Sequence, residues 1–296
     1  MEQIYLNNYS EFAAKAKLYA SQFNLCAILD SCHIPPQCKK AKYKLVIGFG
    51  GNKVLCSPSS KLETLHETWN KDKTWILGVL GYNLKNEIEK LSSLNDTCFY
   101  WPDISFFAPE TVITISWEDK LETYGLNSDI IFESINNFKV SSSLNNSINF
   151  QSDLETDFEK GQHGETVNVI KNEITIGNVY ELNLCSRFLY KNISVSNPYA
   201  LYEELIKISP APFSAYFSDG NKYVLSASPE RYLAKINNTL VSQPIKGTRP
   251  RGNRKEEDEI LKKDLQTNIK DRAENVMIVD LVRNDMARVA EAGSVK

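Results

Sequence analysis

The sequence predicts an α+β protein in which antiparallel sheets are layered with helices. Short apolar runs of strand length are separated by glycine, proline and asparagine, which are typical turn residues. Helical patterns stand between groups of strands and do not alternate with them one by one. The composition, 42% hydrophobic and 24% charged over 296 residues, is that of an ordinary globular protein with one large domain or two smaller ones.

The first part of the chain reads as strands with intervening helices. The pair Gly50-Gly51 separates two apolar runs and predicts a hairpin turn between them. The same glycines lack the spacing of a dinucleotide-binding loop and do not open a helix, so no nucleotide site is expected here. The elements expected in this part are helices at 11–22 and 84–91 and strands at 24–29, 43–49, 75–81 and 111–117.

The second part carries clearer boundary signals. Thr156 and Glu159 have the spacing of a capping box and predict a helix start, and Gly177 is placed where a glycine ends a helix. Asp219-Gly220 and Asn237-Asn238 predict two hairpins. The other expected elements are strands at 179–189, 212–217, 222–227, 232–236 and 240–244, and helices at 198–208, 255–266 and 268–291.

These elements suggest a division into parts. We expect an N-terminal α/β half at residues 1–135, a linker or surface loop rich in serine and asparagine at 136–155, and a catalytic region at 156–296. The final residues, Ala292–Lys296, look like the turn after a helix and the opening of another strand. We therefore expect that the C-terminal part of this region is missing from the sequence.

Charge and composition exclude several classes of partner. Lys and Arg number 34 against 37 Asp and Glu, so the excess of positive charge needed to bind nucleic acid is absent. The longest apolar run, at 75–82, is far shorter than the roughly 20 residues that cross a bilayer. The N-terminus does not resemble a signal peptide, which favours a cytoplasmic protein with reduced thiols. The six cysteines and three histidines do not have the spacing of a zinc site.

Two charged residues follow predicted strands, where the backbone can hold a side chain rigidly. Glu230 follows Pro229, and burial there would raise the pKa of its carboxyl group and suit it to general acid catalysis. The alternative is an edge-strand glutamate paired with Arg231. Lys246 precedes Gly247, which allows close approach of a ligand, and a partly desolvated lysine can act as a nucleophile. The alternative is a loop lysine with its ammonium group in water.

A third carboxylate, Glu274, stands in a predicted helix that is apolar nearly all round and is therefore expected to be buried. A buried carboxylate needs a compensating charge, which a divalent cation or an ion pair with Arg272 or another basic residue would supply. The only basic cluster, residues 249–255, is either an anion-facing loop or, more simply, a solvated turn before the acidic start of the next helix.

Taken together, these motifs resemble those of the chorismate-utilising enzymes, which include anthranilate synthase component I, aminodeoxychorismate synthase component I and the isochorismate and salicylate synthases. Four strings match in order and spacing: GNVYELNLC (Gly177–Cys185), SASPERYL (Ser226–Leu233), QPIKGTRPRG (Gln243–Gly252) and KDRAENVMIVDLVRNDMARV (Lys270–Val289). The first half matches more loosely, through CAILDS (Cys26–Ser31), GYNLKNEIE (Gly81–Glu89) and WPDISFFAPE (Trp101–Glu110). The resemblance implies the fold of anthranilate synthase component I.

The resemblance also implies roles for the charged residues. Glu230 is similar to the general acid that assists departure of the C4 hydroxyl of chorismate, and Glu274 to one ligand of a Mg²⁺ ion that holds the ring carboxylate. Gly247 and Thr248 would line the substrate pocket. A glutamine amidotransferase partner would deliver ammonia. Family members continue well past the position matching Lys296, and that portion carries a second magnesium ligand and the residues that bind the side-chain carboxylate.

Lys246 distinguishes between the members of the family. Anthranilate and isochorismate synthases resemble this motif but carry alanine there, whereas aminodeoxychorismate synthase carries lysine. In that enzyme the lysine resembles a nucleophile that adds to C2 while the C4 hydroxyl departs, after which ammonia adds at C4 and expels it. The sequence therefore favours aminodeoxychorismate synthase component I, on the route to 4-aminobenzoate and folate.

Glu181 departs from the family pattern. Isochorismate and salicylate synthases carry a water-activating lysine at this position, and the ammonia-using members usually carry glutamine. Isochorismate formation is therefore disfavoured, and Glu181 is left without a role. The remaining alternatives are anthranilate synthase component I and a non-catalytic binding protein on the same fold. Whether tryptophan binds near Ser31 is left open.

Overall fold

The computed structural model describes residues 4–5, 9–35, 41–56, 62–72, 74–92, 99–125, 128–139 and 147–296. It confirms the α+β class, since every ladder between the described strands is antiparallel. The chain divides into two compact units, which are described separately. Unit 1 comprises residues 1–146 and 197–229, and unit 2 comprises residues 147–196 and 230–296.

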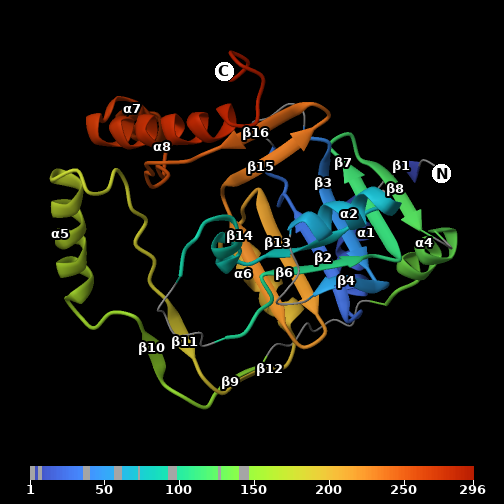
Figure 1. Cartoon of the computed structure of the whole chain (residues 1–296). Helices are drawn as coiled ribbons and strands as arrows, with labels where there is room; N and C mark the ends of the chain where they lie inside the picture. Colours follow the sequence, from blue (N-terminus) through green and yellow to red (C-terminus); the bar gives the residue numbers. More distant parts are fainter. Residues whose placement is uncertain are drawn as a thin grey trace. The chain divides into compact units, whose positions relative to one another are not determined.

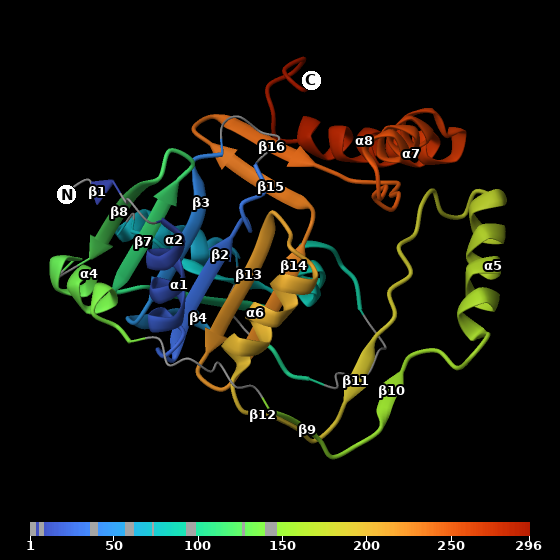
Figure 2. The same ribbon diagram turned by 180° about the vertical axis from the view of Figure 1, so that it is seen from behind.

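Unit 1 is built on a seven-stranded sheet (Figures 1 and 2). The pairing of Ile28 with both Ile47 and Tyr216 places a strand from late in the chain beside two early ones. This is why residues 197–229 belong to unit 1, whereas the predicted division grouped them with the catalytic region. In sheet order the strands are β1 (Ile4–Tyr5), β8 (Lys120–Gly125), β7 (Thr111–Ser116), β3 (Tyr43–Phe49), β2 (Leu25–Asp30), β13 (Phe213–Asp219) and β14 (Tyr223–Ser228).

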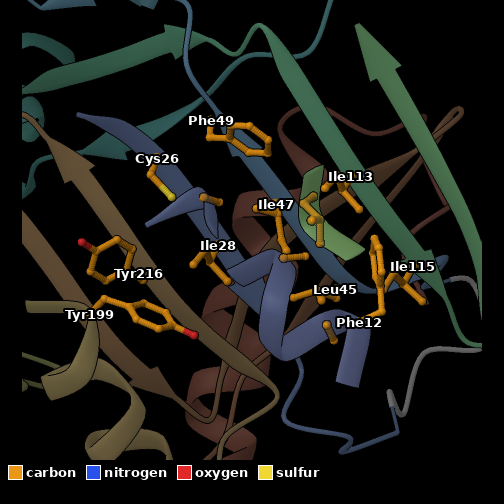
Figure 3. Close-up of a cluster of buried hydrophobic side chains, with 14 of the residues drawn as sticks. Phe12, Cys26, Ile28, Leu45, Ile47, Phe49, Ile113, Ile115, Tyr199 and Tyr216 are labelled. Carbon is orange, nitrogen blue, oxygen red and sulfur yellow. The ribbon is translucent and has the colours of Figure 1, made fainter. Parts of the chain in front are cut away.

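Three helices cover one face of this sheet: α1 (Tyr9–Ala20), α4 (Ser128–Asn136) and α6 (Pro198–Ile208). Their apolar side chains close a core over the inward residues of β2, β3, β7 and β13, part of which Figure 3 shows. Helix α6 begins where the sequence predicts, because the Asn197 side chain accepts a hydrogen bond from the Ala200 N–H at 3.0 Å and Pro198 starts the first turn. Each large core side chain stabilises the fold by about 1.5–3 kcal/mol relative to exposure.

The opposite face of the large sheet packs on a second, three-stranded sheet of β4 (Asn52–Cys56), β6 (Ile104–Ala108) and β5 (Leu77–Leu80). Ala27 and Phe217 of the large sheet meet Leu77 and Phe107 there. The central strands are therefore covered on both faces, which explains why nearly every residue of β3 and β7 is buried. The chain around this second sheet forms α2 (Leu62–Asp72), a 3₁₀ turn (Tyr82–Leu84) and α3 (Lys85–Ile88). Ser31, directly after β2, is also buried, and its hydroxyl oxygen has no hydrogen-bond partner among the described residues.

The predicted hairpin at Gly50-Gly51 is wrong. The glycines do turn the chain, with φ of +69° and +82°, but β4 pairs with β6 and not with β3. A Cβ atom on Gly51 would lie 2.1 Å from the Ala108 carbonyl oxygen, so the glycine permits a close approach to the second sheet. The turn thus moves the chain from one sheet to the other. Five elements of unit 1 were not predicted from the sequence: β1, β6, β8, α2 and α4.

Unit 2 consists of short ladders and three longer helices. The ladders are β9 (Ile148–Phe150) with β12 (Ile193–Val195), β10 (Leu154–Thr156) with β11 (Phe188–Tyr190), and the hairpin of β15 (Arg231–Ile236) with β16 (Thr239–Gln243). The hairpin and its turn at Asn237, where φ is +54°, confirm the sequence prediction. The helices are α5 (Gln162–Thr175), α7 (Lys255–Thr267) and α8 (Ile269–Ala287), and α7 lies beside α8 (Figure 1).

Three predictions in unit 2 need correction. The proposed capping box is wrong, because Thr156 lies in β10 and α5 begins at Gln162, after Gly161. The long strand at 179–189 is also wrong: only 188–190 are paired, and residues 179–187 run without a strand neighbour in the described chain. Of the expected linker, 140–146 lie outside the described residues and 148–150 form β9. Gly177 does end α5 as predicted, with φ of +84°.

Unit 2, which is described throughout, contains no buried residue. The expectation that α8 is buried is therefore not met, and Val276, for example, is 66% exposed. Burial depends on a covering element, and α7, which lies beside α8 within unit 2, leaves the apolar residues of α8 at most half-buried. The predicted turn after the helix is present, with the Ser294 N–H donating to the Glu291 carbonyl oxygen, and residues 292–296 are not paired as a strand with any described segment. None of the described helices has the length and apolarity required to cross a membrane.

Candidate functional site

Lys246 lies in the segment that leaves β16, and two side chains from residues 179–187 hold its ammonium group. Lys246 Nζ donates to Asn183 Oδ1 at 3.0 Å and lies 3.3 Å from Glu181 Oε1. The Lys246 side chain is 25% exposed and that of Glu181 20%. The alternative of a loop lysine with its ammonium group in water is therefore not what the structure shows. The stretch that the sequence reading assigned to a strand instead supplies both partners.

Glu230 lies directly before β15 and contacts the same segment. Its Oε1 atom accepts a hydrogen bond from the Ile245 N–H at 3.2 Å, one residue before Lys246. The residue is exposed, so the burial on which the sequence-based argument depended is absent. Arg231, the alternative partner, donates from Nε to Gln243 Oε1 at 2.8 Å. Glu230 therefore contacts the backbone of the residue that directly precedes Lys246.

Gly247 and Thr248 continue this segment toward the two C-terminal helices. Gly247 has a φ of +77°, and a Cβ atom at this position would lie 3.0 Å from Asp271 Oδ1 and 3.1 Å from a Leu265 methyl carbon. A side chain here would therefore strain the backbone and crowd α7 and α8. The Thr248 carbonyl oxygen accepts a hydrogen bond from Arg249 at 2.9 Å.

Arg249 anchors the segment. Its guanidinium group donates to Asp264 of α7 at 2.6 Å and to Asp271 of α8 at 2.7 Å, and these hydrogen bonds raise the pKa of Arg249. The sequence reading placed Arg249 in an anion-facing loop or a solvated turn and missed this role. The sequence does place two aspartates, Asp264 and Asp271, in the predicted helices that follow the cluster. Which arginine these aspartates contact, however, depends on the path of the loop.

The next arginine forms a second anchor at the start of α7. Arg251 donates twice to the Asp258 carboxylate, at 2.7 Å each, and the Gly252 N–H donates to it at 2.9 Å. The Arg251 contact and the Gly252 N–H lower the pKa of Asp258 to about 2. Two arginines of the basic cluster, Arg249 and Arg251, are therefore paired with carboxylates of the helices that follow it.

The pairing of Arg251 with Asp258 predicts how the stability of the folded chain changes at acid pH. Because the pKa of Asp258 is lower in the folded chain than its ordinary value of 3.8, its stabilising contribution is complete above pH 4 and is lost as the pH falls through about 2. We expect Arg251→Gln to raise the carboxyl titration midpoint of Asp258, followed by carbon NMR, toward 3.8. Arg283→Gln, which removes a positive charge from a different helix, α8, should leave the titration midpoint of Asp258 unchanged. An unchanged midpoint in Arg251→Gln would contradict the assignment.

Glu274 lies on α8, one helical turn after Asp271, which contacts Gly247. Its side chain is 45% exposed, and Lys270 Nζ lies 3.7 Å from its carboxylate, so the ion pair that the sequence offered with Arg272 or another basic residue is formed with Lys270. The described residues contain no cluster of three or more His, Cys, Asp or Glu able to hold a metal. Magnesium commonly takes only one or two protein carboxylates beside water and substrate oxygens, and an accessible carboxylate such as Glu274 fits that use.

The chain belongs to the family of chorismate binding enzymes, whose family model matches residues 41–296. It is 43% identical over 143 residues to an aminodeoxychorismate synthase of Streptomyces griseus, covering 48% of this chain and 20% of that protein. It is 30% identical over 304 residues to anthranilate synthase component 1 of Saccharolobus solfataricus, covering 97% of this chain and 68% of that protein. The relatives named here are therefore split between aminodeoxychorismate synthase and anthranilate synthase component 1.

The solved structure of anthranilate synthase component I from Streptococcus pneumoniae confirms the fold. It superposes with a TM-score of 0.66 at 19% identity and covers 87% of this chain and 64% of that one. The fold predicted from the resemblance is thus correct. The chain spans between about a fifth and about two thirds of the length of the relatives named here.

Proposed function

We propose that this chain is the chorismate-binding part of aminodeoxychorismate synthase component I, which replaces the C4 hydroxyl group of chorismate by an amino group from ammonia. The observation that carries the proposal is the position of Lys246. Its Nζ atom donates to Asn183 Oδ1 at 3.0 Å, and the residue before it, Ile245, donates its N–H to Glu230. An amine that directly follows a residue hydrogen-bonded to a carboxyl group suits a substitution that needs both a nucleophile and a proton donor.

In the proposed reaction the Lys246 amine adds to C2 while Glu230 protonates the departing C4 hydroxyl group. Ammonia then adds at C4 and expels the lysine, which leaves the amino group at C4. Gly247 and Thr248 would lie along the bound ring, because they directly follow Lys246, whose amine would be bonded to that ring; the side of Gly247 that lacks a side chain is packed against Asp271 and Leu265. Arg249 would keep this segment fixed on α7 and α8.

Two further components belong to the proposal. Glu274 would act as one ligand of Mg²⁺, whose positive charge would neutralise the ring carboxylate of chorismate. A glutamine amidotransferase subunit would supply the ammonia, as the designation of related proteins as component 1 of aminodeoxychorismate synthase suggests. The cytoplasmic location expected from the sequence stays a prediction.

Anthranilate synthase component I is the second candidate, because the relative that covers 97% of this chain bears that name. The two activities are distinguished by their products. The full gene product, supplied with chorismate, ammonium and Mg²⁺, should form 4-amino-4-deoxychorismate, which liquid chromatography with mass spectrometry identifies. Formation of anthranilate and pyruvate would establish the alternative.

The proposed magnesium ligand makes a specific prediction. Glu274→Gln in the full gene product should raise the Mg²⁺ concentration required for half-maximal activity by at least about tenfold, because a neutral amide replaces a charged oxygen ligand. The melting temperature without Mg²⁺ should change little, since the side chain is 45% exposed. Glu259→Gln, at a glutamate of α7 with an ion pair of similar spacing, is the matched control. Unchanged Mg²⁺ dependence in Glu274→Gln would mean that the residue is not a ligand.

A further inference from the structure

The hairpin of β15 and β16 contains a β-bulge close to Glu230. From the turn as far as Ala234 the two strands pair one residue with one residue, but the next pair is Arg231 with Gln243. Two residues of β15, at positions 232 and 233, therefore stand opposite a single residue of β16, which is the arrangement of a β-bulge. The bulge thus lies between the regular part of the hairpin and Glu230.

The bulge changes the face of the hairpin on which the preceding residues lie. Side chains alternate between the two faces of a strand, so one extra residue moves the residues before it to the opposite face relative to the partner strand. The burial pattern shows this change, since Arg231 and Ala234 are both half-buried whereas the two bulged residues between them are exposed. Three positions apart in a regular ladder, Arg231 and Ala234 would lie on opposite faces. Glu230, which precedes Arg231, is displaced in the same way.

Two side-chain hydrogen bonds hold this irregular geometry. The Ser242 hydroxyl group donates to the Tyr232 carbonyl oxygen at 2.7 Å, across the bulge. Arg231 Nε donates to Gln243 Oε1 at 2.8 Å and joins the two strands at their last pair. A bulge locally disrupts the backbone ladder, so these side chains supply links between the strands where the ladder is interrupted.

The pair of Arg231 and Gln243 stands next to both segments of the proposed reaction. Glu230 directly precedes Arg231, and residues 244–246, which end at the proposed nucleophile, directly follow Gln243. Between these segments, Glu230 Oε1 accepts the Ile245 N–H at 3.2 Å. Proton transfer requires the donor to lie within hydrogen-bond reach of the group that it protonates. The pair that joins the two segments therefore also controls where the carboxyl group of Glu230 lies.

We propose that Arg231 and Gln243 are positioning residues, which together with the bulge orient the carboxyl group of Glu230 toward the segment of Lys246. Neither side chain is assigned a contact with the reacting atoms. This inference rests on the proposed function, in which Glu230 protonates the departing C4 hydroxyl group. Misplacement of a reacting group by about 1 Å is enough to slow a reaction markedly. Loss of the pair should therefore lower kcat and leave substrate binding nearly unchanged.

The test is a double-mutant cycle of Gln243 and Glu230 in the full gene product. Gln243→Leu keeps the approximate size of the side chain but removes the acceptor of Arg231 Nε. We expect kcat to fall about tenfold, with KM for chorismate changed by less than about threefold. In the Glu230→Gln background the same substitution should lower kcat by less than about twofold, because the acid through which the pair acts is already absent. The matched control is Gln162→Leu, which removes a glutamine oxygen that accepts the Glu159 N–H at 2.9 Å and should keep the kcat of the wild type.

A second measurement reports on the position of Glu230 without turnover. Hydrogen exchange followed by mass spectrometry with electron-transfer fragmentation gives the exchange rate of the Ile245 amide. In Gln243→Leu this N–H should exchange at least about threefold faster, since a displaced Glu230 no longer accepts it. Gln162→Leu should leave the exchange rate of Ile245 at its wild-type value. An unchanged rate in Gln243→Leu would overturn the positioning role.

The outcomes also separate this inference from the proposed function. A wild-type kcat in Gln243→Leu, or the same fall in kcat with and without Glu230→Gln, would overturn the positioning role and leave Glu230 as the acid. A wild-type kcat in Glu230→Gln would overturn the proposed acid and this inference with it. A fall in kcat that disappears in the Glu230→Gln background, together with faster exchange at Ile245, supports the assignment.

Discussion

Replacing Lys246 by alanine in the full gene product should lower the rate of 4-amino-4-deoxychorismate formation by at least about 10³-fold, because the nucleophile is removed. The measurement is the initial rate with chorismate, ammonium and Mg²⁺ at saturation. The fold should be retained, since the side chain is 25% exposed and belongs to a unit without buried residues.

The matched control is Lys235→Ala, which removes an exposed lysine from the neighbouring strand β15. Its rate should equal that of the wild type, and both variants should melt at the wild-type temperature. Formation of anthranilate by Lys246→Ala would add support, because anthranilate synthases resemble this motif with alanine in place of the lysine. A wild-type rate of 4-amino-4-deoxychorismate formation in Lys246→Ala would show that ammonia attacks the substrate without a lysine adduct.

The second large effect is expected at Glu230. Glu230→Gln should lower kcat by about 10²–10³-fold, because an amide cannot protonate the departing hydroxyl group. The amide oxygen can still accept the Ile245 N–H, which Glu230 accepts at 3.2 Å, so the loop geometry should persist. KM for chorismate should accordingly change by less than about threefold.

Glu165→Gln, at an exposed position in the first turn of α5, is the control for removal of a single carboxylate. It should leave kcat and KM as they are in the wild type. A kcat for Glu230→Gln within about twofold of the wild type would remove this residue from the proposed reaction and would require another proton donor for the hydroxyl group.

Elements whose signals are local in the sequence were predicted well. Helix α6 begins at the asparagine cap followed by proline, and β3 occupies the apolar run 43–49. The hairpin of β15 and β16 follows from its two asparagines. The helix start and the hairpin turn depend on interactions within a few residues, and the apolar run of β3 marks a buried strand even though it does not identify the partners of that strand.

Predictions that depended on distant partners were wrong. Gly50 and Gly51 turn the chain as expected, but the destination of the next strand was decided by pairing with β6, more than fifty residues away. Residues 179–187 have the composition of a strand but lack a neighbouring strand in the described chain. The apolar sides of α8 predict burial, yet burial also requires a covering segment, and the sequence of the helix does not specify one.

In the candidate site, too, residues with local signals were identified from the sequence, whereas contacts between distant residues were not. Glu230, Lys246 and Glu274 could be selected because their charges stand in contexts that make them conspicuous, next to a proline, before a glycine and within an apolar helix. The contact between Lys246 and Glu181, 65 positions apart, could not be predicted, because it depends on the path of an irregular segment. Arg249 was missed for the same reason, since its partners lie on two later helices.

The central claim, that Lys246 forms a covalent adduct with the substrate, is tested most directly by mass spectrometry of the full gene product. The protein is incubated with chorismate and Mg²⁺ without ammonia, quenched with acid and digested. The account predicts that the peptide containing Lys246 gains the mass of chorismate less one water, and that brief addition of ammonium before the quench removes this mass and releases 4-amino-4-deoxychorismate. An unmodified Lys246 in a preparation that turns over chorismate and ammonia, or an adduct on a different residue, would contradict the account.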